Sequence, residues 1–176
     1  MTCTTSFWLD EHARFGRLLD LLEGQLDRFH AGMRPDYAVM LDVVRYMRSY
    51  ADAVHHPRED LAFEKVAASN PACRARVDAL TSEHEGIAES GEALVSLLEA
   101  VVDGAIIERT HVEEPGRAYA RCLRDHMRRE ELLFSDVTRL LRDSDWDAIE
   151  RAVPLRPDPL VVPMPGDAFE GLRSAA

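Results

Sequence analysis

The fold of this chain depends on the stretch His55-His56-Pro57-Arg58-Glu59-Asp60-Leu61-Ala62-Phe63 and on its counterpart His126-Met127-Arg128-Arg129-Glu130-Glu131-Leu132-Leu133-Phe134. Both stretches carry His, Arg, Glu, Leu and Phe at the same offsets, and an acidic residue follows each Glu. On an α-helix, residues i and i+4 lie one above the other, with Cβ atoms about 5–6 Å apart. Each stretch therefore predicts a helix that presents one imidazole and one carboxylate on the same face, and two such helices facing each other could hold metal.

Length and composition predict a soluble globular protein. At 176 residues, with 46% hydrophobic and 30% charged residues, the chain is most simply one domain with a core of its own. The apolar runs are too short for a transmembrane helix, and the N-terminus lacks the basic and apolar regions of a secretory signal. We therefore expect a cytoplasmic protein that does not contact the membrane.

Charge and cysteine content narrow the classes of function. The net charge is −11 and the sequence has no basic stripe, which argues against a nucleic-acid partner. Cys3, Cys73 and Cys122 are far apart in the sequence and odd in number. This argues against a disulfide framework and against a cysteine-rich zinc site.

Prolines divide the chain into predicted helices. Pro35, Pro71 and Pro115 each stand where an apolar helical pattern restarts, and proline is favoured at the first position of a helix. The resulting helices cover residues 7–31, 35–69, 71–103 and 114–142. Each has an apolar seam with alternating steps of three and four residues, which is typical of helices in a bundle.

The predicted fold is all-α: an up-down antiparallel four-helix bundle in residues 1–150, with a short C-terminal helix near 144–149. Residues 151–176 contain Pro154, Pro157, Pro159, Pro163 and Pro165 and cannot continue a bundle helix. We expect this proline-rich tail to pack on the bundle or on a second subunit, which would make a homodimer. A partly disordered tail is the alternative.

Pro57 stands inside the predicted second helix, where its ring should kink the helix. Such a kink would either aim His55 and His56 at a common site or be a tolerated bend without a function.

Each predicted seam also contains one histidine at a position where an ordinary bundle has Leu, Ile or Ala. Buried imidazoles and carboxylates cost folding free energy unless they have partners, and a metal centre supplies those partners. The candidate ligands are His12, His55, Glu59, His84, His126 and Glu130. This set exceeds the four ligands of a tetrahedral zinc site and suits two ions that share bridging carboxylates. Iron, manganese and zinc all accept such ligands.

These residues resemble the hemerythrin-like, or HHE cation-binding, domain family over about residues 7–142. The resemblance rests on Glu11-His12 early in the first helix, Glu83-His84 in the third, and the H-x-x-x-E motifs in the second and fourth. It implies an up-down four-helix bundle that holds a non-haem di-iron centre, two iron ions with an oxo or hydroxo bridge. It also implies that Glu59 and Glu130 bridge the irons.

The sequence departs from the oxygen-carrying members of that family at two positions. Those members have a second histidine on the third helix where this chain has Ala88. They also have an aspartate five residues after the histidine of the fourth helix, whereas here Glu130 follows after four. His56 borders the same seam and could supply the missing imidazole, either as a ligand or as a donor behind the ligands. Pairing His56 with Asp60 also keeps the i,i+4 spacing but breaks the match between the two stretches.

Several side chains around the motifs have simpler expected roles. Arg58 and Arg129 recur at equivalent positions, and we expect them to pair with the surface acids Asp60 and Glu131. Cys122 is expected to be a small buried hydrophobic residue.

The sequence leaves three classes of function open. The first is a di-iron protein that binds or senses oxygen, nitric oxide or peroxide, or stores iron. The second is a di-iron enzyme, either a peroxidase, a nitric oxide reductase or an iron donor for the repair of iron–sulfur clusters. The third is a bundle whose site is empty or holds one structural zinc. No general base outside the ligands stands out, which favours binding over catalysis.

Overall fold

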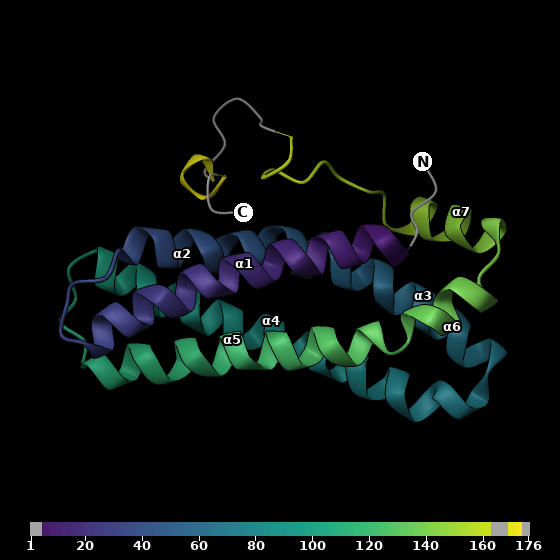
Figure 1. Cartoon of the computed structure of the whole chain (residues 1–176), viewed down its shortest axis with the longest axis horizontal. Helices are drawn as coiled ribbons and strands as arrows, with labels where there is room; N and C mark the ends of the chain where they lie inside the picture. Colours follow the sequence, from purple (N-terminus) through teal and green to yellow (C-terminus); the bar gives the residue numbers. More distant parts are fainter. Residues whose placement is uncertain (1–4, 163–168, 174–176) are drawn as a thin grey trace.

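The structure is a computed structural model that describes residues 5–162 and 169–173. These residues form helices and no strand, which confirms the predicted all-α class (Figure 1). The α-helices are α1 (Thr5–His30), α2 (Tyr37–Tyr46), α3 (His56–Ser69), α4 (Arg74–Val102), α5 (Arg109–Glu131), α6 (Phe134–Leu140) and α7 (Asp143–Ala152). A π-helix (Met47–His55) joins α2 to α3, and short 3-10 turns occur at Pro71–Cys73 and Glu170–Leu172. No helix in the described part of the chain is long and apolar enough to span a membrane.

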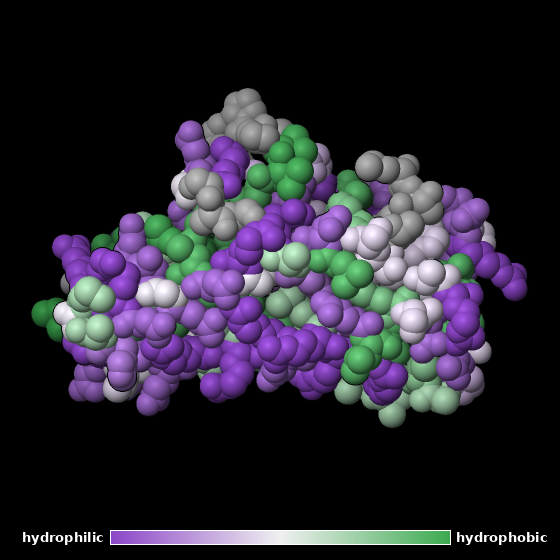
Figure 2. Space-filling model, viewed as in Figure 1, coloured by the Kyte–Doolittle hydropathy of each residue, from purple (hydrophilic) through white to green (hydrophobic). Residues whose placement is uncertain are grey.

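The long helices lie side by side as a helical bundle. Helix α1 packs on α5 and α2, and α4 packs on α5, α2 and α3 (Figure 1). The surface in view over α1 and α5 is mostly hydrophilic (Figure 2). Arg117 and Arg124 on α5 form ion pairs across this surface with acids on α1.

The buried apolar residues form two clusters along the bundle. The larger cluster includes Phe15 and Leu123, and the smaller one includes Trp8, Phe63 and Phe134. Along α1, Trp8 belongs to the smaller cluster and Phe15 to the larger, so His12 lies between them in the sequence. On α4, His84 likewise lies between Leu80 of the smaller cluster and Ile87 of the larger one. The candidate ligands therefore form a polar layer between two apolar ones.

The second predicted helix differs most from the expectation. Residues 35–69 were expected to form one α-helix that Pro57 kinks, but the chain instead passes through a π-helix. The N–H of His56 bonds to the carbonyl of Ala51, five residues back. Helix α3 follows directly, and Pro57 lies in its first turn, where its missing N–H costs little. The helix accommodates Pro57 by a change of hydrogen-bond register.

The fourth predicted helix is also corrected at both ends. Helix α5 begins at Arg109 and carries Pro115 inside it, because Val112 is buried and a Cβ on Gly116 would lie 3.0 Å from Leu26 on α1. That packing favours helix on both sides of the proline. The helix ends at Glu131, and α6 starts after a turn. The turn lets the adjacent residues Leu133 and Phe134 both enter the smaller apolar cluster.

The C-terminal part of the chain begins with the predicted short helix, which is longer than expected as α7. The chain then continues as an irregular segment, residues 153–162, which we call the C-terminal segment. Asp158 and Leu160 of this segment are buried, as is Leu172 further on. Pro163 and Pro165 lie outside the described residues.

Candidate metal centre

All seven candidate residues are buried and come together from four parts of the bundle. The potential ligand atoms fall into two groups, each within 4.8 Å: one made of His12, His55, Glu59 and Glu130, the other of His56, His84 and His126. We call them the His12 group and the three-histidine group.

Glu130 connects the two groups. Its Oε1 lies 2.9 Å from Nε2 of His84 and 3.0 Å from Nε2 of His126. Its Oε2 lies 3.5 Å from Nε2 of His12, which belongs to the other group. One carboxylate thus faces both groups, as a bridging ligand must.

Within the His12 group, the ligand atoms converge. Nε2 of His12 lies 3.1 Å from Nε2 of His55. Glu59 places one oxygen 3.6 Å from the first nitrogen and the other 3.1 Å from the second. Two imidazole nitrogens that face each other beside a carboxylate are the arrangement expected around a cation.

Several atoms of the site lack a hydrogen-bond partner among the described residues. They are both carboxylate oxygens of Glu59, Oε2 of Glu130 and Nε2 of His126. A buried polar atom without a partner costs about 1–3 kcal/mol, and more when it is charged. Metal ions would satisfy these atoms, so the residues present fit a metal centre.

Behind the ligand atoms, Nδ1 of every candidate histidine faces a carboxylate. The distances are 3.1 Å from His12 to Glu131, 2.7 Å from His55 to Glu11, 3.3 Å from His56 to Asp52, 3.0 Å from His84 to Asp60 and 2.9 Å from His126 to Glu83. In the four pairs other than His56–Asp52 the contact is a hydrogen bond, and such a carboxylate holds the proton on Nδ1, orients the ring and leaves the lone pair of Nε2 for a metal.

Four of these acids form a ring around the bundle. Each lies next to a candidate ligand in the sequence but supports the histidine of a neighbouring helix. Glu11 of α1 supports His55, Asp60 of α3 supports His84, Glu83 of α4 supports His126, and Glu131 of α5 supports His12. The acid after each motif Glu was visible in the sequence, but its partner is set by helix packing. This role was missed because it joins residues far apart in the chain.

The expected pairs of Arg58 with Asp60 and of Arg129 with Glu131 are wrong. Arg58 is buried and donates to Glu150 of α7 at 2.9 Å and to the carbonyl of Val153. Arg129 donates instead to Glu83 at 2.6 Å. The acids of the expected pairs, Asp60 and Glu131, instead face Nδ1 of His84 and of His12.

His56 lies where it could supply the imidazole that is missing at Ala88, because it groups with His84 and His126. Its ring stacks on His84 at a centroid distance of 4.3 Å and lies 5.6 Å from the ring of His126. The alternative pair with Asp60 is not formed, because Asp60 faces His84. Ala88 stands where the oxygen-carrying members of the family have a histidine. Its backbone carbonyl accepts a hydrogen bond from Arg48.

Neighbouring carboxylates and imidazoles shift the pKa values of the candidate histidines in opposite directions. Burial lowers the pKa of His55, but the carboxylates of Glu59 and Glu11 outweigh it and raise the pKa well above its ordinary value. For His84, burial is likewise outweighed by two carboxylates, which raise the pKa to about 9. His56 behaves in the opposite way, since burial and the neighbouring imidazoles hold its pKa well below the ordinary value. Metal ions would supply positive charge here in place of protons.

Aromatic rings enclose the His12 group. Phe15 lies 5.0 Å from the ring of His55, and Phe134 lies 5.4 Å from the ring of His12. Trp8 contacts His55 edge-on at 6.5 Å. Cys122 is not part of this wall: it is exposed, contrary to the expectation of a buried residue.

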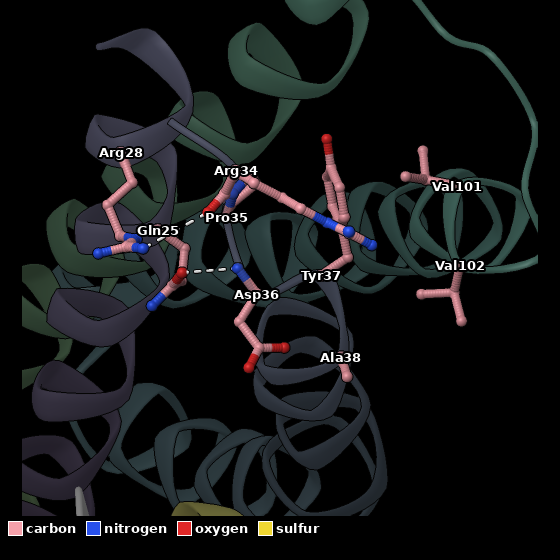
Figure 3. Close-up of a pocket in the computed structure, with 9 residues that line it drawn as sticks. All are labelled: Gln25, Arg28, Arg34, Pro35, Asp36, Tyr37, Ala38, Val101 and Val102. Atoms are coloured by element: carbon pink, nitrogen blue, oxygen red, sulfur yellow. Dashed lines mark hydrogen bonds between the residues drawn. The ribbon is translucent and has the colours of Figure 1, made fainter. Parts of the chain in front are cut away.

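A large surface hollow lies at the other end of the bundle. It has a volume of about 730 Å³, and its walls come from the end of α1, the start of α2, the loop between them and the end of α4 (Figure 3). Arg28 in its wall is about 24 Å along α1 from His12, at 1.5 Å per residue. The hollow is therefore separate from the candidate metal centre.

A comparison with protein families agrees with this geometry. The model of the hemerythrin HHE cation-binding domain matches residues 3–137. The chain belongs to this family. The match includes all seven candidate ligands of this hemerythrin-like protein and ends before α7 and the C-terminal segment. No curated protein and no solved structure matches the chain significantly.

Proposed function

We propose that this hemerythrin-like protein holds two iron ions and uses them to bind or sense oxygen, nitric oxide or peroxide. The observation that supports the proposal most is that Glu130 faces two separate groups of converging ligand atoms. The three-histidine group would hold one ion. His12 and His55 would hold the other, with Glu59 and Glu130 shared between the ions.

The residues of the site have separate tasks in this proposal. A pair of iron ions supplies the redox chemistry and the coordination position for a small molecule. These ligands do not fill two six-coordinate ions, so a position stays open. The acids hydrogen-bonded to Nδ1 of His12, His55, His84 and His126 keep these rings turned inward. The aromatic wall limits the entry of water.

The family fold supports this assignment. We propose that α1, the continuous stretch α2–π-helix–α3, α4 and α5 act as the four helices of an up-down bundle. In that arrangement each of the four contributes one histidine of the original set, and the second also contributes His56.

The first experiment is the metal content of protein purified without chelators, with absorption spectra before and after reduction and exposure to air. About two irons per chain, with near-ultraviolet bands that change on reduction, are expected for a di-iron centre. One zinc per chain, or no metal, would contradict the proposal. Titration of the reduced protein with oxygen, nitric oxide and peroxide then identifies the ligand that changes the spectrum.

A further inference from the structure

Glu11 differs from the other acids behind the histidines because it is deeply buried. Its side chain is 2% exposed, against 42% for that of Glu131. Water cannot satisfy a carboxylate at such a position, so it needs donors from the protein. One oxygen faces Nδ1 of His55 at 2.7 Å, and the other accepts a hydrogen bond of 2.5 Å from the hydroxyl of Tyr50. Tyr50 thereby fixes Glu11, which in turn orients His55.

Tyr50 is itself held by a second tyrosine. The rings of Tyr50 and Tyr46 stack at a centroid distance of 5.8 Å and an angle of 18°. Both rings are buried, and Phe15 contacts Tyr46 at 6.2 Å as well as His55 at 5.0 Å. A shift of Tyr46 would therefore reach His55 through both Tyr50 and Phe15.

The hydroxyl of Tyr46 is hydrogen-bonded to the C-terminal segment. It donates to Oδ2 of Asp158 at 3.0 Å, and Nε of Arg14 lies 2.8 Å from the same oxygen. Asp158 is only 6% exposed. A carboxylate buried in this way is placed for specific partners, and its partners here come from α1 and α2.

The segment that carries Asp158 is ordered locally and anchored at its start. Oδ1 of Asp158 accepts from the N–H of Leu160, and its carbonyl accepts from the N–H groups of Val161 and Val162. At the other end, Arg58 donates to the carbonyl of Val153. Arg58 lies on α3, the helix that carries the candidate ligand Glu59, so the segment is anchored to a helix of the site.

We infer that Asp158 is a positioning residue of the metal centre, acting through Tyr46, Tyr50 and Glu11 on His55. The inference rests on the proposed function, namely that these residues hold metal. Coupling between two sites is reciprocal. Metal binding therefore strengthens the docking of the C-terminal segment, and loss of docking weakens metal binding.

The test is the affinity for cobalt(II), a metal whose absorption bands report its coordination, in Asp158→Asn, Tyr50→Phe and the double variant. Tyr50→Phe should weaken binding about 10-fold, as does loss of a partner behind a metal ligand. Asp158→Asn should weaken binding by a smaller factor and change the cobalt bands. In the double variant the effect should be less than the product of the two single effects, because both act along one path.

The matched control is Tyr37→Phe, which removes the same hydroxyl group at the far end of the bundle (Figure 3). This variant should bind cobalt like the wild type. Wild-type affinity and spectrum in Asp158→Asn, or single effects that multiply in full, would overturn the inference. A wild-type protein that binds no cobalt would contradict the proposed function as well.

A second measurement needs no variant. Hydrogen exchange of the Leu160, Val161 and Val162 amides should slow on addition of cobalt by a larger factor than that of Gly104 and Ala105. The latter two amides are hydrogen-bonded in the turn after α4, away from the site, and report any general stabilisation. Equal slowing of both sets would show that the segment is not coupled to the metal.

Discussion

Glu130 is the side chain on which the proposed two-metal arrangement depends, because it faces both groups of ligand atoms. We predict that Glu130→Ala lowers the metal content to one ion per chain or none. His111→Ala, which changes an exposed histidine in the first turn of α5, should leave it unchanged. Metal analysis of both variants after identical purification provides the measurement. Full metal content in Glu130→Ala would show that Glu130 does not bridge.

The acids behind the histidines allow a closely matched comparison. Glu83 and Glu85 flank His84, but only Glu83 supports His126, whereas Glu85 is exposed. We predict that Glu83→Gln lowers metal affinity about 10- to 100-fold, because an amide holds the Nδ1 proton of His126 less strongly than a carboxylate. Glu85→Gln should have no effect in the same cobalt titration. Equal affinities in the two variants would contradict the role of the acid ring.

At the scale of the secondary-structure elements, two adjacent histidines at the junction of the π-helix and α3 belong to different groups of ligands. His55 joins the His12 group, and His56 joins the three-histidine group. Adjacent residues on a helix point about 100° apart, so one helix can serve two neighbouring ions. Tyr50, which donates a hydrogen bond to Glu11, also lies within this π-helix.

Substitution of Pro57 tests whether this proline is needed to direct His55 and His56 to their ligand groups. Because Pro57 lies in the first turn of α3, we predict that Pro57→Ala leaves the metal content unchanged and alters the free energy of unfolding by less than about 1 kcal/mol. Denaturant unfolding and metal analysis give the two values. Loss of metal without loss of helix content would favour the other interpretation, in which the proline aims His55 and His56.

At the scale of the whole molecule, the polar layer of candidate ligands lies between two apolar clusters, so metal ions bound there would be part of the core. Without metal, the oxygens of Glu59 lack hydrogen-bond partners, and carboxylates crowd the layer. We predict that the metal-loaded protein melts several degrees higher than protein treated with a chelator, since metal that binds only the folded state adds to its stability. Differential scanning calorimetry of the two forms tests this, and identical melting temperatures would argue against a metal in this layer.

Residue spacing alone predicted the helical class, the candidate ligands and the family. These rest on local spacing: His55 with Glu59, and His126 with Glu130, are four residues apart, and any α-helix places such pairs on one face. His56 could be suggested as a further ligand because it borders the same seam. The π-helical stretch within the second predicted helix could not be predicted, because it depends on which residues of that helix the other helices bury.

Long-range packing sets which acid supports which histidine, where Arg58 and Arg129 find partners, and how Asp158 contacts Tyr46. Each of these contacts joins residues from different elements. Periodicity shows which face of a helix is buried, but not which helix lies against it. That choice follows from packing all helices at once, so the ring of acids and the attachment of the C-terminal segment exist only in the folded chain.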